Sequence, residues 1–444
     1  MSQADLDETD ESLPLSSLKS SGNGEGDEGS ELLLKDNAPP PKPQSSILYS
    51  NAANTVFIVD IPTSISRAQW LSGQAASSHQ LLSCPPPESP YPSTEPKCEK
   101  ARTKVLDRLN QDEEYKELHA GYARLIESAL NHLKDHHPIS GPETSQPFCL
   151  PRALQGDGNP LNNSNKLKKK RKAERDPPHC YSAKSASPQQ NLLQNHSSQS
   201  EYPNTASSTT LPPLSTILLG LIDTSSSALS TYHSACFSHL PDYHGRFPLI
   251  ILDPPWPNKS ASRSSSYATS PTLPILVETL QGLSLETHMQ HSGYIACWIT
   301  NKAATHQAVL GTQGLFETWG VQLVEEWIWC KVTTRGEPVT EVAGIWRKPY
   351  EVCLIGQRRT DAASLDHHTP QRRVIFGVPD LHSRKPCLKD LAARLLFGNE
   401  EERQESRDCA ALELFARYAV AGWMSWGLEA NKYNHRDWWV DQCR

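Results

Sequence analysis

Tryptophan is distributed very unevenly along this 444-residue chain. Ten of its 11 tryptophans lie at or after Trp256, and only Trp70 precedes that position. Because large buried aromatic side chains build hydrophobic cores, the main core is predicted to lie in the C-terminal half. The chain is long enough for two domains, but its order is therefore expected to differ from one part to another.

The C-terminal part, residues 211–444, has the pattern of an α/β domain, in which short apolar runs alternate with helical stretches. Strands are predicted at residues 249–252, 294–300, 322–331, 350–357, 373–378, 410–417 and 423–427, and helices at 274–282, 303–319 and 389–397. Residues 211–444 contain no Gly-x-Gly-x-x-Gly and no phosphate loop. Nucleotide hydrolysis and dinucleotide redox chemistry therefore have no support.

Three segments precede this domain. Residues 1–46 are acidic and rich in Ser, Gly and then Pro, which predicts disorder. Residues 47–135 hold two short β-like runs and a helical stretch, and we expect a small N-terminal domain or, as the alternative, a helix packed on the C-terminal domain. The helical stripe consists of Leu118, Tyr122, Leu125, Ala129 and Leu133. Residues 136–210 are polar and are predicted to be a disordered linker.

The linker contains a basic cluster, KLKKKRK at residues 166–172. It predicts a nuclear-import signal, with a merely solvated charge run as the alternative, and it could also hold nucleic acid through phosphates. The 11 cysteines include no Cys-x-x-Cys pair, so no metal site is expected and a reducing compartment is favoured. The acidic start and the lack of a long apolar stretch indicate neither a signal peptide nor a membrane partner. We expect a monomeric nuclear protein.

The most informative motif is Asp253-Pro254-Pro255-Trp256, directly after the apolar run 247–252. An acid at a strand end can accept a hydrogen bond from an amine, and the prolines fix the direction of the Pro254 carbonyl, which can accept another. An exposed indole at position 256 would offer a stacking face to a flat ligand. The motif therefore indicates a site for the exocyclic amine of an aromatic base.

Six sequence words resemble the DPPW family of eukaryotic adenine-N6 methyltransferases, and within it the branch called methyltransferase-like protein four. The words are ILDPPWPNKS (251–260), CWITNK (297–302), EEWIWCKVTTRGE (325–337), RKPYEVCLIG (347–356), LHSRKP (381–386) and LELFAR with GWMSWG (412–427). The resemblance implies a Rossmann-like domain with permuted motif order and a mixed sheet. It also implies S-adenosylmethionine as the methyl donor and nucleic acid as the substrate.

The resemblance also suggests roles for individual residues. Asp253, Pro254, Pro255 and Trp256 would form the catalytic slot, in which the acid and the carbonyl hold the adenine amine in line with the methyl group. Cofactor contacts are expected from Asp253, Lys385, Glu413, Arg417 and Glu429, and substrate contacts from Asn258, Lys259, Arg263, Tyr267 and Asn301. Lys385 is expected to meet the cofactor carboxylate, because a compact ammonium suits that group.

One position departs from the family pattern. Leu428 stands where the family has an asparagine that contacts the cofactor, and leucine can neither donate nor accept a hydrogen bond. One cofactor contact is therefore missing or is supplied elsewhere, for which Glu429 and Asn431 are candidates.

Three functions remain open at this point. The first is adenine-N6 methylation of RNA, at a site of the small nuclear RNA type, and the second is the same reaction on DNA. The third is an inactive RNA-binding scaffold of the same fold. The intact Asp253-to-Trp256 word and Lys385 favour an enzyme, whereas Leu428 is the main argument for the scaffold.

Overall fold

The computed structural model describes most of the chain beyond residue 44. The described residues are 45–74, 79–93, 98–110, 112–137, 147–154, 192–197, 199–200, 208–222, 237–240, 243–257, 272–344, 347–358, 369–381, 384–397 and 408–441. The chain divides into residues 1–41 and residues 42–444, and all described residues belong to the second unit. The fold below is that of this unit.

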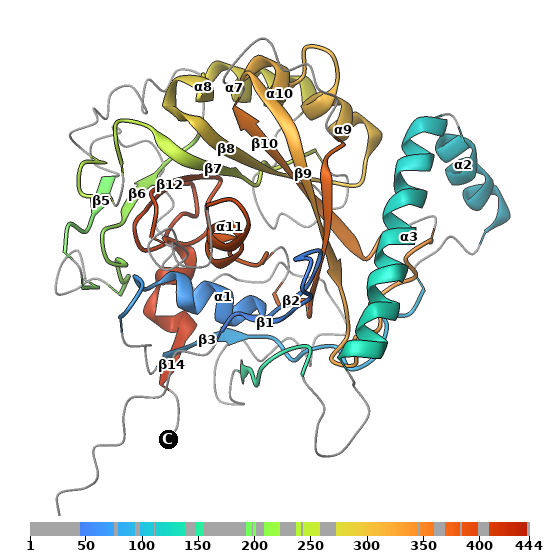
Figure 1. Ribbon diagram of the computed structural model, residues 1–444, viewed down its shortest axis with the longest axis horizontal. Coiled ribbons are helices and arrows are strands. Elements are labelled where there is room, and N and C mark those ends of the chain that lie inside the picture. Colours follow the sequence, from blue (N-terminus) through green and yellow to red (C-terminus); the bar gives the residue numbers. More distant parts are fainter. Residues whose placement is uncertain are drawn as a thin grey trace, which may run out of the picture. The chain divides into compact units, whose positions relative to one another are not determined.

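Eleven strands of the described part form one mixed sheet (Figure 1). In spatial order they are β1 (Ile47–Ser50), β2 (Val56–Val59), β11 (Gln371–Gly377), β9 (Val321–Lys331), β10 (Tyr350–Arg358), β8 (Met289–Ile299), β7 (Phe247–Leu252), β12 (Ala411–Leu414), β13 (Trp423–Gly427), β6 (Thr216–Leu219) and β5 (Leu192–Gln194). Most neighbours run parallel, whereas β10 is antiparallel to both β8 and β9. All seven strands predicted from the sequence are present.

The strand β7 shows why these segments form strands. All six of its residues, FPLIIL, are buried. Its side chains alternate between two cores: Leu249 and Ile251 belong to one hydrophobic cluster, and Ile250 and Leu252 belong to the other. A strand that is covered on both faces reads as a continuous apolar run, and this one lies in the interior of the sheet.

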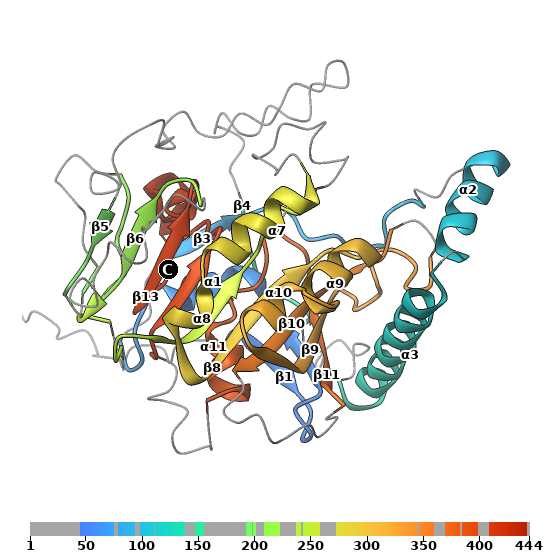
Figure 2. The ribbon, with the colours of Figure 1, turned by 90° about the horizontal axis from the view of Figure 1, so that it is seen from above.

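Helices cover both faces of the sheet (Figures 1 and 2). On one face, α1 (Ile61–Ala68) and α11 (Lys389–Leu395) pack with Trp327 and Trp329 of β9. The other face carries α3 (Glu113–His136), α7 (Leu273–Gly282), α8 (Leu285–His288), α9 (Ala303–Leu310) and α10 (Leu315–Thr318). This layered arrangement around a large mixed sheet confirms the predicted Rossmann-like α/β class.

The helix predicted at 303–319 is two helices, α9 and α10. The backbone NH of Gly311 donates to the Gln307 carbonyl at 2.8 Å, and Gly311 itself has extended backbone angles that end α9. Gly314, also extended, begins α10. The apolar periodicity continues across this break because Val309 and Leu315 pack on the same core, which is why the sequence pattern read as one helix.

The separate N-terminal domain expected at residues 47–135 is wrong. Strand β2 pairs in parallel with β11, with Val56 opposite Val374, so β1 and β2 extend the large sheet. The helix α2 (Glu99–Asn110) precedes α3. The predicted apolar stripe of α3 packs against the main core, where Tyr122, Ala129 and Leu133 are buried. Two short strands cannot bury enough surface alone, and the large sheet supplies the missing partner.

Part of the predicted linker is also ordered. The strand β5 forms one edge of the large sheet, and β4 (Ala153–Leu154) pairs with β3 (His79–Ser83). A small sheet contains β3, β4 and β14 (Trp439–Asp441), and the 3-10 helices η3 (Lys432–Asn434) and η4 (Arg436–Trp438) precede β14. The basic cluster at 166–172 lies outside the described residues.

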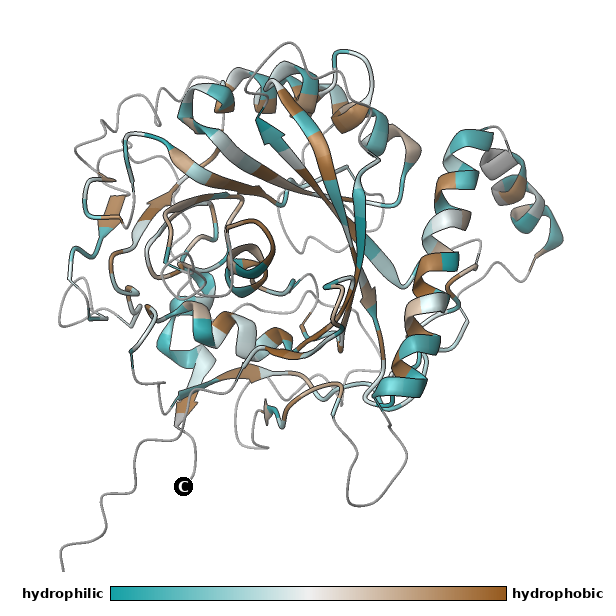
Figure 3. Cartoon of the chain, in the orientation of Figure 1, coloured by the Kyte–Doolittle hydropathy of each residue, from teal (hydrophilic) through white to brown (hydrophobic). Residues whose placement is uncertain are grey.

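Hydropathy follows this layering (Figure 3). Strand β7 is largely hydrophobic, whereas α3 alternates between hydrophobic and hydrophilic residues along its length. That alternation is expected for a helix with one face on the core and the other in solvent. Among the described helices, none has the length and apolar character needed to cross a membrane.

Candidate active site

Asp253 lies immediately after the carboxyl end of β7. The parallel neighbours β8 and β12 end at the same edge of the sheet, with Leu252 paired to Cys297 and to Leu414. Ligands of open α/β sheets bind outside the carboxyl ends of the strands. The motif chosen from the sequence therefore stands at the edge where this architecture places its sites.

Lys385 forms an ion pair with Asp253. Its Nζ lies 2.9 Å from Oδ1 and 3.0 Å from Oδ2 of Asp253, and 3.2 Å from Oε2 of Glu351. The lysine side chain is only 15% exposed. Burial alone would lower the pKa of Lys385, but the two carboxylates raise it above its usual range. The ammonium is therefore fully charged at neutral pH and joins two strand ends.

Glu351, on β10, is a site residue that the sequence analysis missed. It accepts hydrogen bonds from Lys331 and ion-pairs with Lys385. Burial would raise the pKa of Glu351, but the two ammonium groups lower it below its usual range. The signal was present in RKPYEVCLIG, where a charged residue interrupts an otherwise apolar strand.

The two prolines form a tight turn. The backbone NH of Trp256 donates to the Pro254 carbonyl at 2.7 Å, an i to i+2 bond centred on Pro255, whose ring favours the φ of an inverse γ-turn. A carbonyl oxygen has two lone pairs, so one remains for a ligand. The proposed acceptor role of Pro254 is compatible with this turn.

The prediction of an exposed indole at position 256 is wrong. Trp256 is 4% exposed and belongs to the hydrophobic core, and its Nε1 donates to the Trp298 carbonyl at 2.7 Å. The reason is physical: an indole buries a large apolar area, and its single NH is satisfied by the end of β8. Trp256 thus anchors the turn on the sheet.

A pocket adjoins the Asp253–Lys385 pair and brings together residues that are far apart in the sequence. Asp253, Lys385, Glu413 and Arg417, four of the expected site residues, line it together with aromatic side chains and the newly found Arg384. The aromatic members are Trp298, Phe415, Tyr418, Trp423 and Tyr433.

Glu413 faces this pocket from β12. Its Oε2 is buried and has no hydrogen-bond partner in the described part of the chain. Burial, together with the negative charge of Asp253, raises the pKa of Glu413 to about 8. An unsatisfied buried carboxyl oxygen costs free energy, and a ligand hydroxyl that donates to it would remove that cost. The acid therefore fits a polyhydroxylated ligand such as a ribose.

Arg417 and Glu429 stand beside each other. Arg417 Nε lies 3.7 Å from Oε2 of Glu429, and Lys432 Nζ lies 3.1 Å from its Oε1. Glu429 is thus held between two cations and is not among the residues that line the pocket. Leu428, where the resemblance predicts an asparagine, is half-buried in the turn after β13.

The expected substrate residues are only partly described. The side-chain amide of Asn301, just beyond β8, donates to the Tyr350 carbonyl, so it ties the ends of two strands together. Asn258, Lys259, Arg263 and Tyr267 lie outside the described residues. Lys302 reaches the catalytic turn, because its Nζ contacts the Pro257 carbonyl at 2.5 Å. The sequence analysis did not select this lysine, although CWITNK contains it.

Comparison with known proteins agrees with this geometry. The MT-A70 family model matches residues 247–429. The "N6-methyladenosine RNA methyltransferase MTA1" of Cryphonectria parasitica is 30% identical over 406 residues, which cover 89% of this chain and 94% of that protein, and the protein of the same name in Pyricularia oryzae is 29% identical with 89% and 96% covered. The human "N(6)-adenine-specific methyltransferase METTL4" is 31% identical over 52% of this chain and 44% of its own length. The chain belongs to the MT-A70 family.

Proposed function

We propose that this protein transfers a methyl group from S-adenosylmethionine to the N6 amine of adenine in RNA. Membership of the MT-A70 family makes it an adenine-N6 methyltransferase. The single observation that carries the site assignment is that the Asp253–Lys385 pair lines one pocket together with Glu413 and Arg417.

The residues fit the proposed donor. Glu413 offers ribose hydroxyls a buried oxygen that has no hydrogen-bond partner among the described residues, and the aromatic lining of the pocket offers faces for an adenine ring. Lys385 provides positive charge for the carboxylate of the donor, which would share the ammonium with Asp253 and Glu351. When bound, the donor supplies an electrophilic methyl group on a sulfonium.

The chain's own contribution concerns the amine. An adenine N6 nitrogen gives its lone pair to the ring and is a poor nucleophile. Asp253 can accept a hydrogen bond from one N–H and the Pro254 carbonyl from the other, which favours a pyramidal nitrogen aimed at the methyl group. The amine gains positive charge as the reaction proceeds, and the carboxylate and the carbonyl dipole stabilise that charge. Lys385 fixes the carboxylate for this role with hydrogen bonds to both of its oxygens.

RNA is the proposed polymer because of the names of the relatives that match along most of their length. The two fungal proteins that align with 89% of this chain are named RNA methyltransferases. The Caenorhabditis elegans "DNA N6-methyl methyltransferase" is 31% identical over 45% of this chain. We further propose a site of the small nuclear RNA type, on the resemblance to the methyltransferase-like protein four branch, and DNA is the competing substrate.

A competition assay tests the function. Purified full-length protein receives labelled S-adenosylmethionine with small RNA, messenger RNA and DNA in one reaction, beside the isosteric variant Asp253→Asn. We expect label in small RNA with the wild type and a loss of at least about a hundredfold with the variant, as for removal of a group that acts only in the transition state. Label in DNA alone would refute the RNA proposal, and RNA binding without any label would favour the scaffold.

Nuclear localisation is a separate proposal, which rests on the basic cluster at 166–172. Replacement of its lysines and arginine by alanine is expected to move a fluorescently tagged protein out of the nucleus. An unchanged distribution would contradict the proposal, and an unchanged thermal melting curve would serve as the control that the variant is folded.

A further inference from the structure

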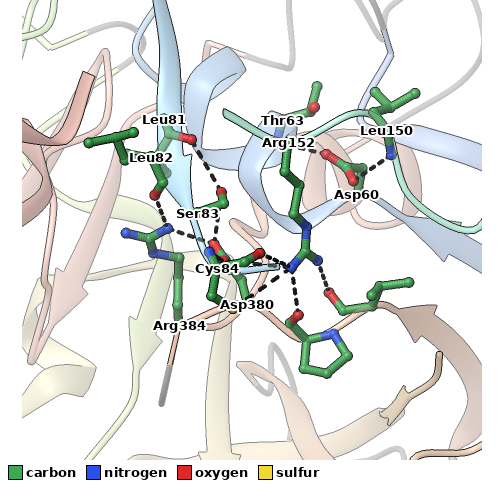
Figure 4. A network of polar contacts seen from close by, with 12 residues as sticks. Asp60, Thr63, Leu81, Leu82, Ser83, Cys84, Leu150, Arg152, Asp380 and Arg384 are labelled. Carbon is green, nitrogen blue, oxygen red and sulfur yellow. Dashed lines mark hydrogen bonds and ion pairs between the residues drawn. The ribbon is translucent and has the colours of Figure 1, made fainter. Parts of the chain in front are cut away.

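Lys385 lies on the connection between β11 and α11, and residues outside the six shared sequence words hold this connection in place. The guanidinium of Arg152 donates to three carbonyls: Val378 at 2.8 Å, Pro379 at 2.9 Å and Cys84 at 3.0 Å (Figure 4). Arg152 belongs to the described segment 147–154, more than 200 positions before Lys385 in the sequence. One side chain thus joins two N-terminal segments to the start of the Lys385 connection.

Asp380 is the centre of the same network. Its Oδ2 accepts from Arg384 Nη1 at 2.6 Å and from the Ser83 hydroxyl at 3.3 Å, and its Oδ1 accepts from the Cys84 backbone NH at 3.0 Å. Arg152 Nη1 lies 3.8 Å from Oδ1. Figure 4 shows the carboxylate between the two guanidinium groups.

The network is closed to solvent. The side chains of Arg152, Asp380 and Arg384 are 2%, 0% and 0% exposed. Two cations share one carboxylate, and neighbouring carbonyl oxygens supply further acceptors, among them Leu82, which accepts from Arg384 Nη1 at 2.8 Å. Among the described residues, Nε of Arg152 and Nε and Nη2 of Arg384 have no hydrogen-bond partner. Loss of one member would leave buried charge and carbonyl groups unpaired, the situation in which a buried ion pair matters most.

The side chains of the consecutive residues Arg384 and Lys385 bind different parts of the protein. Arg384 is fixed on the N-terminal side by Asp380 and Leu82, and its guanidinium stacks 4.2 Å above the Tyr433 ring. The next side chain, Lys385, extends to Asp253. Since the two residues share one peptide bond, a shift of the Arg384 backbone also shifts the backbone that carries Lys385.

We propose that Arg152 and Asp380 are positioning residues for Lys385, so that the segments around 82–84 and 152 set the affinity for the methyl donor. This proposal rests on the proposed function, because it takes S-adenosylmethionine as the ligand of the pocket. A displacement of about 1 Å in an active site can cost about a hundredfold, so the network need not touch the ligand to control its binding.

The test compares two buried arginines of the full-length protein. Arg152→Ala removes the network anchor, and Arg373→Ala is the matched control. Arg373 also makes a buried ion pair, with Nη2 and Nε each 2.6 Å from Glu325, but it lies near the start of β11, about 16 Å along the strand from Val378. Calorimetry measures the dissociation constant for S-adenosylmethionine, and thermal melting measures stability.

We expect Arg152→Ala to raise that dissociation constant, and the KM for the methyl donor, by about tenfold or more while the KM for nucleic acid stays within about twofold. The control should lose melting temperature without a change in affinity. Equal affinity of wild type and Arg152→Ala would overturn the proposal, because the network would then be structural only.

A second variant protects the test against misfolding. Arg152→Lys keeps the charge and loses the planar fork that reaches several carbonyls, and it should weaken donor binding by an intermediate factor. Unaltered affinity in Arg152→Lys, with Arg152→Ala unfolded, would also refute a positioning role. Failure of the proposed function is a different result, since it appears as wild-type protein that labels no adenine.

Discussion

Replacement of Lys385 by methionine is the most revealing perturbation of the site, because methionine keeps an unbranched apolar stem and removes only the charge. In the wild type the ammonium serves two carboxylates, Asp253 and Glu351. Without it, Glu351 still has Lys331. Asp253 loses a partner that contacts both of its oxygens, and it stands in the neighbourhood of Glu413.

The magnitude follows from the distances. A unit charge pair about 3 Å apart is worth about 5 kcal/mol at an effective dielectric constant of about 20, and desolvation of the partners offsets part of this. We expect Lys385→Met to lower the free energy of unfolding by about 3 kcal/mol, the lower end for a broken buried pair. Asp253→Asn should cost only about 1 kcal/mol, because Lys385 keeps Glu351 at 3.2 Å.

Urea denaturation at pH 7 measures both variants. The pKa of Lys385 is raised in the folded state, so its contribution is complete below the ordinary lysine pKa of about 10.4 and is lost only as pH rises through the folded value. The midpoint should shift with an unchanged slope. Equal losses in the two variants, or a larger loss in Asp253→Asn, would refute the reasoning that one lysine holds two acids together.

Three further predictions concern titration and packing. The pKa of Glu413 is raised to about 8 in the folded state, so its contribution to the free energy of unfolding is complete below pH 4.5 and is lost as pH rises to about 8. Glu413→Gln should abolish this slope when the free energy of unfolding is measured as a function of pH. An unchanged slope would contradict the assignment. Burial, with the positive charges of its surroundings, lowers the pKa of His119 to about 4, so the wild type should lose stability as pH falls from about 6.5 to 4, whereas His119→Gln should lose less over this range by the same measurement. Gly336 has φ +79°, and a Cβ there would lie 2.4 Å from the Phe148 ring. Gly336→Ala should therefore lower the free energy of unfolding by about 1–3 kcal/mol, and by less in a Phe148→Ala background. Strict additivity of the two substitutions would show that the ring is not the obstacle.

The local secondary structure and the position of Asp253 at the end of a strand could be predicted from the sequence. The strand β7 is a continuous apolar run, and Asp253 follows its end, because a strand covered on both faces favours apolar residues until it leaves the sheet. The stripe on α3 was visible for the same reason, since a helix with one buried face repeats its apolar residues every three or four positions. The six shared words supplied the family.

Contacts between distant segments were decided only by the tertiary structure. Whether β1 and β2 form their own domain or extend the catalytic sheet depends on the pairing of Val56 with Val374, over 300 positions apart. The burial of Trp256 likewise depends on where β8 ends, and the partners of Lys385 depend on which strand ends meet. Periodicity and propensity report on neighbours within a few residues, so they place an acid at a strand end but cannot reveal which lysine the fold brings to it.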